Sequence, residues 1–206
     1  MPQETSSSYT PWPQFHRNGL APTNAEIRPL YERTRRFRNY TSTVVSGALQ
    51  TADYTRAILR AISDWDGLPD DVEEAVAIRV ERQNFLHDGQ HQYDILIEEF
   101  VLRNPIGGPE VMLGQLQHLL DALALDSVQL GIIPVGVSRS ARWPKEGFWL
   151  YDDVQASSEL IGGYLQITDP DQIAVYARTF DDLSALAVHD ASAAGLIDNA
   201  IKALQT

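Results

Sequence analysis

The hydrophobic and polar positions in the first half of the chain alternate with the period of a helix. Apolar residues fall near every third or fourth position over residues 48–62, and turn residues at 64–69 end that pattern. A second amphipathic helix is predicted over residues 69–86. It has acidic residues in its first turn and Arg79 and Arg82 towards its end, as the helix dipole favours. We expect the two segments to form a helical hairpin.

A strand, a helix and a second strand are predicted next, in that order. Residues 93–98 and 127–134 have the apolar pattern of strands, and residues 109–124 form a helical pattern that begins with a proline. Such a unit places two parallel neighbours in one sheet. It is the best-defined piece of architecture in the sequence.

The remaining segments complete a mixed fold. The Pro- and Ser-rich residues 1–24 are predicted to form an extended arm, in which Trp12 and Phe15 indicate docking on its own domain or on a second copy of the chain. A polar helix over residues 25–37 and an extended segment at 41–45 follow. The later elements are strands at 147–151 and 158–168 and helices at 169–186 and 190–204.

The fold class expected from these elements is α+β or α/β. A single domain over residues 25–206 would hold a small mixed sheet with the strand–helix–strand unit, covered by about five helices. The length of 206 residues and the 44% hydrophobic content are sufficient for one substantial core.

The amino-acid composition excludes several kinds of functional site. The chain has no cysteine, which excludes disulfides, thiolate nucleophiles, iron–sulfur clusters and thiolate zinc sites. No apolar stretch approaches the roughly 18 to 20 residues that span a bilayer, and residues 1–13 lack the basic start and apolar core of a secretory signal. We therefore expect a cytoplasmic protein with no membrane partner.

The net charge of −12 is unevenly distributed. Residues 1–60 carry eight arginines against four acids, and residues 61–206 carry eight basic residues against twenty-four acids. The only dense cationic run, residues 33–38, is expected to line a helix whose arginines pair with acids or, through Arg33 and Arg36, contact a protein partner. Direct nucleic-acid binding needs a stronger cationic face, so none is expected.

Several motifs occur in an order that resembles a known family. Residues 44–51 (VVSGALQT), followed by Tyr54, resemble its "VPGLLQT..Y" signature, although Ser46 stands in place of the proline. Similar landmarks follow at residues 82–83 (RQ), 99–103 (EFVLR), 107–112 (GGPEVM), 115–120 (QLQHLL), 132–134 (IIP) and Phe148. The family is the actinobacterial, especially Streptomyces, domain of unknown function that follows Xre-type helix-turn-helix segments in Scr1-type antitoxin-like regulators.

The resemblance covers roughly residues 26–204 and implies a module that senses a small molecule or binds a protein. The Pro/Ser-rich residues 1–24 cannot form the helix-turn-helix that precedes this domain in the family. We therefore expect a stand-alone module, working alone, as a possible homodimer or beside a separate DNA-binding partner.

A ligand pocket is one interpretation of the aromatic residues. Alternation along residues 147–151 puts Trp149 and Tyr151 on one face of a strand, where they could line an apolar pocket edged by arginines or simply pack between sheet and helices. The first interpretation suits a small apolar or carboxylate-bearing ligand. The expected ligand-binding residues are Gln50, Tyr54, Arg82, Glu99, Trp149 and Tyr151.

An enzyme is the alternative. Glu98 and Glu99 lie at the exit of a predicted strand, where ligands gather in open sheets and where a desolvated carboxyl can act as general acid or base. A repurposed enzyme of specialised metabolism would use them for a cyclisation, condensation or hydrolysis. In the competing interpretation both carboxylates cap or pair with arginines, and the sequence leans towards no catalysis.

No cofactor or metal is expected. His87 and His91 are four residues apart, but Gly89 between them indicates a solvated turn rather than a metal site. The loop at residues 107–109 precedes a helix yet lacks the Lys and Ser/Thr of a phosphate loop, so a structural turn is favoured.

Overall fold

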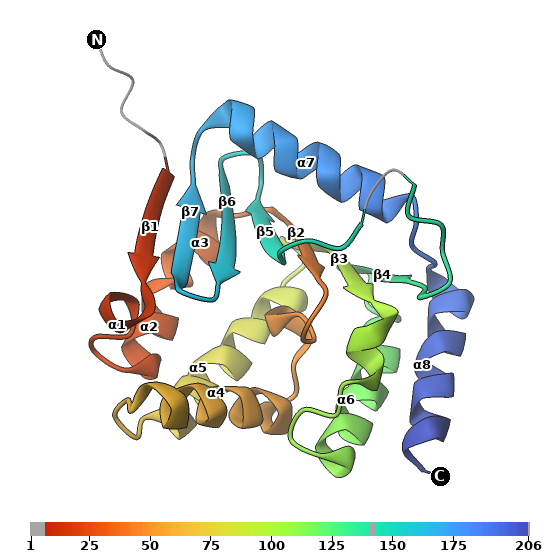
Figure 1. The fold of residues 1–206 in the computed structure, drawn as a ribbon, viewed down its shortest axis with the longest axis horizontal. Coiled ribbons are helices and arrows are strands. Elements are labelled where there is room, and N and C mark those ends of the chain that lie inside the picture. Colours follow the sequence, from red (N-terminus) through yellow and green to blue (C-terminus); the bar gives the residue numbers. More distant parts are fainter. Residues whose placement is uncertain (1–6, 141–142, 206) are drawn as a thin grey trace.

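The computed structural model describes residues 7–140 and 143–205 and shows a mixed sheet with helices on both faces (Figure 1). The strands are β1 (Ser7–Pro11), β2 (Arg36–Thr41), β3 (Gln92–Glu98), β4 (Val128–Ile133), β5 (Phe148–Tyr151), β6 (Gln155–Leu160) and β7 (Gly163–Ile167). The α-helices are α1 (Trp12–Phe15), α2 (Leu20–Glu26), α3 (Arg28–Arg33), α4 (Ala52–Asp66), α5 (Val72–Arg82), α6 (Pro109–Ala122), α7 (Pro170–Ser184) and α8 (Asp190–Leu204). Short 3-10 turns are η1 (Gly47–Leu49), η2 (Gln83–Leu86) and η3 (Glu99–Arg103).

The described strands form one seven-stranded sheet in the order β1-β7-β6-β5-β2-β3-β4. β2, β3 and β4 run parallel, whereas β5, β6, β7 and β1 are joined by antiparallel pairings. The predicted mixed α+β fold is therefore confirmed, and so is the strand–helix–strand unit, in which α6 connects the parallel strands β3 and β4.

Each face of the sheet has its own apolar core. On one face, Phe37, Tyr93 and Ile95 pack with residues of α6, α8 and η1. On the other, Tyr40 and Leu96 pack against α7, which crosses that face in Figure 1. Burial on both faces explains the near-continuous apolar run of β3, because such strands have no solvent-facing side.

The helix predicted over residues 25–37 is wrong in its second half. The chain forms α2 and α3 and then leaves the helix at Thr34, and β2 begins at Arg36. The arginine-rich residues 33–38 are typical of a solvent-exposed helix face. In the structure, however, Phe37, Arg38 and Asn39 are buried between β3 and β5. Tertiary pairing has overridden the local propensity.

The N-terminal residues dock on their own domain, which is one of the two alternatives that the sequence left open. β1 pairs with β7, the Trp12 indole donates to the Leu160 carbonyl at 2.9 Å, and Phe15 stacks on Tyr164 with ring centroids 4.8 Å apart. Among the described residues, no helix is both long and apolar enough to cross a membrane.

Gly19 is a point at which this docking can be tested. Its φ of +100° favours glycine, a Cβ there would overlap the Asp71 carboxylate, and that carboxylate accepts the Ala21 amide at 2.8 Å. We predict that Gly19→Ala lowers the free energy of unfolding by about 2–4 kcal/mol, the sum of backbone strain and a disturbed buried hydrogen bond.

The measurement is urea denaturation, with Gly67→Ala as the matched control. Gly67 also has a positive φ, of 64°, but an added Cβ meets nothing within 4 Å, so only the strain of about 1–2 kcal/mol remains. Equal losses in the two variants would contradict the proposed clash with Asp71.

Candidate functional site

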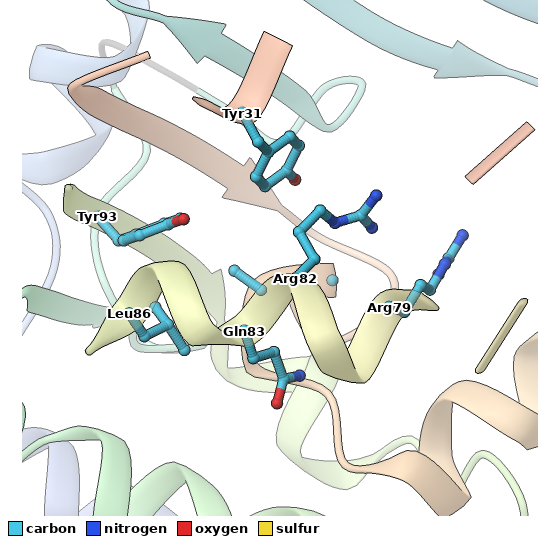
Figure 2. A pocket seen from close by; sticks show the side chains of 8 residues that line it. Tyr31, Arg79, Arg82, Gln83, Leu86 and Tyr93 are labelled. Atoms are coloured by element: carbon cyan, nitrogen blue, oxygen red, sulfur yellow. The ribbon is translucent and has the colours of Figure 1, made fainter. Parts of the chain in front are cut away.

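A pocket lies between α5, α3 and η1, and Figure 2 shows the residues that line it, six of them labelled. Gly47 and Ala48 complete the lining. The pocket is shallow and measures about 190 Å³ when its opening to solvent is counted. The enclosed part has room for about one water molecule, so a ligand group would lie at the open mouth of the pocket rather than inside it. The labelled lining residues are Tyr31, Arg79, Arg82, Gln83, Leu86 and Tyr93.

Two arginines of α5 form the polar wall of the pocket. Val72, Ala75 and Val76 are the buried residues of α5, and one further turn of the same face brings Arg79 and then Arg82. Both arginines are half-buried. They therefore occupy positions where the helical period would place apolar side chains.

Neighbouring groups hold both guanidinium groups in place. The Arg82 guanidinium carbon lies 4.6 Å from the centre of the Tyr31 ring, a cation–π contact. Arg79 donates from Nε to the Asn24 Oδ1 at 2.7 Å, and Arg82 donates to the Asn24 carbonyl at 3.4 Å. Asn24 is itself buried in α2, so the partner that both arginines share is neutral.

Within residues 7–140 and 143–205, no carboxylate lies at ion-pairing distance from either of these two arginines. Seven other arginines have a carboxylate oxygen within 4.0 Å, and the four remaining described arginines without one, Arg17, Arg33, Arg35 and Arg178, are exposed. Desolvation, followed by repulsion from Arg82, lowers the pKa of Arg79 to about 10. The carboxylate of Glu159 on β6 opposes this shift only in part.

Two predicted ligand residues, Gln50 and Tyr54, lie behind the pocket rather than in its lining. The Gln50 side chain donates to the Val45 carbonyl at 2.7 Å, and the Tyr54 hydroxyl accepts the Val45 amide at 3.2 Å. Gln83 donates to the Gln50 carbonyl at 2.6 Å. These bonds hold η1 against α5 and so shape the wall that Gly47 and Ala48 provide.

Trp149 and Tyr151 share one face of β5, as the alternation predicted. Their ring centroids lie 6.4 and 6.2 Å from that of Tyr31, and burial raises the pKa of the Tyr151 hydroxyl. Neither residue is among those that line the pocket. They support Tyr31 from the sheet, and Tyr31 in turn meets Arg82.

The carboxylates considered for catalysis lie elsewhere, at the carboxyl end of β3. Glu98 accepts the Tyr40 hydroxyl at 2.8 Å and a hydrogen bond from Arg139. Burial, and then the Glu98 contact, raises the pKa of Tyr40. Glu99 accepts hydrogen bonds from Arg103 at 3.1 Å and from the Val135 amide at 3.0 Å. Both carboxylates therefore already accept hydrogen bonds, and neither lines the pocket formed around Arg79 and Arg82.

Arg33 and Arg36 do not share a helix face, so that placement is wrong. Arg33 ends α3 and is exposed, whereas Arg36 begins β2 and pairs with Asp94 at 2.6 Å. His91 is buried, with its Nδ1 2.7 Å from Asp88. Within residues 7–140 and 143–205, no group of three or more His, Cys, Asp or Glu side chains is placed to hold a metal ion.

The fold and pocket belong to a family of uncharacterised domains. Residues 27–199 match the family described as a domain of unknown function, DUF5753, and the chain belongs to that family. The match supports the resemblance inferred from the motifs at the level of a domain of unknown function. No curated protein is similar enough in sequence to match.

Two solved structures with a similar course of the backbone are both distant. One is TrmBL2, described as an archaeal chromatin protein with a novel mode of DNA binding, with a TM-score of 0.47 and 10% identity over 92% of this chain and 55% of that one. The other is NucT from Helicobacter pylori, with a TM-score of 0.48 and 10% identity over 89% of this chain and 98% of that one. The chain thus spans about half the length of TrmBL2.

The expectation of no nucleic-acid partner is corrected by these matches. A DNA-binding chromatin protein is among the solved structures that resemble this chain. It was therefore wrong to exclude a nucleic-acid partner on the basis of net charge. The net charge of a whole chain averages over local fields, and residues 1–60 alone carry a net positive charge. Similarity at these TM-scores gives no positive argument for an activity.

Tyr40 provides a test of how the Glu98 carboxylate is satisfied. We predict that Tyr40→Phe lowers the free energy of unfolding by about 1–3 kcal/mol, because a buried carboxylate loses one of its two donors. Tyr176→Phe is the control, since its hydroxyl meets Glu146 at 3.4 Å on the surface and its loss should stay within about 0.5 kcal/mol. Chemical denaturation of both variants decides the point, and a stability equal to wild type in Tyr40→Phe would refute it.

Proposed function

We propose that this chain is a regulatory recognition module that binds a small molecule or a protein partner through an anionic group seated against Arg79 and Arg82. One observation carries the proposal: two adjacent, half-buried guanidinium groups share a neutral asparagine, and no carboxylate of the described residues lies within ion-pairing distance of either. An uncompensated charge away from water is costly, and an anion would remove that cost. Arginine is also the side chain best suited to bind carboxylate and phosphate groups.

The construction of the pocket suits a sensor. Its walls come from four separate parts of the chain, namely α3 with Tyr31, η1 with Gly47, α5 and the adjoining η2 with both arginines, and β3 with Tyr93. An anion that bridges them binds one relative placement of these segments better than another, and such a difference in affinity is what shifts a conformational equilibrium.

The setting we propose follows from the sequence motifs. We infer that the module serves a regulatory system like those of the Streptomyces Xre-type, Scr1-type antitoxin-like regulators, and that it acts in the cytoplasm. The membership in the DUF5753 family supports this reading without specifying it. We assign no catalytic role to Glu98 or Glu99, because donors from Tyr40, Arg139, Arg103 and Val135 already engage them.

Calorimetric titration of the full chain with simple anions tests the proposal. The probes are sodium phosphate, sodium sulfate and sodium acetate, with sodium chloride holding the ionic strength constant. We predict a dissociation constant in the millimolar range, about −4 kcal/mol, for at least one of these oxyanions. Arg82→Gln should weaken that binding about tenfold or more, because it removes a charge-assisted hydrogen bond.

Arg28→Gln is the matched control. Arg28 is an exposed arginine paired with Glu32 and Glu81, so its loss should leave the affinity unchanged. Thermal unfolding of each variant confirms that it is folded. Oxyanion binding that is identical in wild type and Arg82→Gln, or no binding at all, would refute the proposed site.

A further inference from the structure

The lining of the arginine pocket contains two cationic side chains and no acidic one. It comprises Arg79 and Arg82, the uncharged polar residues Tyr31, Gln83 and Tyr93, and small or apolar residues. The two guanidinium groups stand one turn apart on α5, so each repels the other. A monoanion can neutralise only one of them, whereas a dianion matches both.

The acids that influence this region lie outside the lining. Glu159 is exposed on β6, where water and salt screen it, and Asp71 is held by the Ala21 amide. His16, the other titratable neighbour of Arg79, has a pKa lowered mainly by burial. Neither Glu159 nor Asp71 forms an ion pair with Arg79 or Arg82, and Glu159 offsets the lowered pKa of Arg79 only in part.

Several hydrogen-bond donors lie on one side of α5. In Figure 2 the Tyr31 hydroxyl and the guanidinium ends of Arg82 and Arg79 project to the same side of α5, and the Gln83 side chain projects away from them. The Gln83 amide is also committed to the Gln50 carbonyl. Three donor groups on one side correspond to the three free oxygens of a phosphate monoester.

The size of the pocket adds a further restriction. Because its enclosed part holds about one water molecule, a head group can be seated only at the open mouth of the pocket, and the remainder of the molecule stays outside. Resting on the proposed function, we infer that the pocket binds the dianionic phosphate of a monoester at the end of a larger molecule. Both a phosphorylated metabolite and a phosphorylated side chain present this same group.

Titration with matched small probes separates charge from shape. Methyl phosphate and methyl sulfate share a tetrahedral shape, but at pH 8 the first is mainly a dianion and the second a monoanion. Dimethyl phosphate represents the monoanionic diester of a nucleic-acid backbone, and acetate represents a carboxylate. We predict that the full chain binds methyl phosphate at least tenfold more tightly than each of the other three.

Variants locate the binding. Arg79→Gln and Arg82→Gln should each reduce the preference for methyl phosphate over methyl sulfate towards unity, and Arg28→Gln should preserve it. Arg82→Lys, which keeps the charge, should retain more of the preference than Arg82→Gln. An equal preference in the wild type and all four variants would overturn the assignment of the dianion to this pocket.

The two levels of the hypothesis fail in different ways. If methyl phosphate, methyl sulfate and acetate bind equally and Arg82→Gln weakens all three, the anion site stands and the monoester assignment is overturned. Tighter binding of dimethyl phosphate would likewise overturn it in favour of a diester. If none of the probes binds, both proposals fail. Titration with glycerol 3-phosphate and with O-phosphoserine then identifies the source, and binding of either one with at least the affinity of methyl phosphate supports the inference.

Discussion

The pairing of β2 with two neighbours of opposite direction is the constraint on which the rest of the structure depends. β2 runs parallel to β3 and antiparallel to β5, so it joins the parallel half of the sheet to the meander. Phe37 stacks on Tyr93 with centroids 4.5 Å apart in one core, and Tyr40 packs in the other. The Asn39 side chain donates to the Phe148 carbonyl at 2.8 Å. Because successive side chains of a strand point to opposite faces, one short segment anchors both cores, and a slip of one residue would exchange them.

The position of β2 also determines the pocket. α3 ends only two residues before β2 begins, so the strand's place in the sheet brings Tyr31 to within 4.8 Å of Phe37, measured between ring centroids. Tyr31 then lies over Arg82, with Trp149 and Tyr151 of the neighbouring β5 around it. α5 approaches from the opposite side through its contacts with α2 and η1. Aromatic residues of the sheet thus support the one ring that meets Arg82, although those side chains are not in the pocket lining.

The sequence was sufficient to predict the helices and strands in which apolar residues recur with a clear period. The helices around α4, α5, α6, α7 and α8 and the strands β3, β4 and β5 agree with prediction to within a few residues, because their apolar spacing agrees with their environment. β2 could not be predicted in this way, since Arg36, Arg38 and Asn39 are polar. Arg38 is buried only because Asp153 and the Asp152 carbonyl accept from it across the sheet. In the site, Arg82 was anticipated and Arg79 was missed, although the spacing from Val72 through Val76 to Arg79 marks it as a charged residue on a buried face.

The same spacing explains why the arginine pair points to function rather than stability. An apolar side chain at position 79 would continue the face formed by Val72 and Val76, and replacing buried charged groups by well-packed apolar ones is often neutral or stabilising. The repulsion between the two arginines works against folding, and the hydrogen bonds to Asn24 and the contact with Tyr31 offset it. Exposed arginines elsewhere on the chain, such as Arg28 and Arg56, have carboxylate partners, so the chain has no general lack of acids with which to pair. A charge that is placed on a buried face, held by a neutral asparagine and kept away from the abundant acids is best explained by a group that arrives from outside.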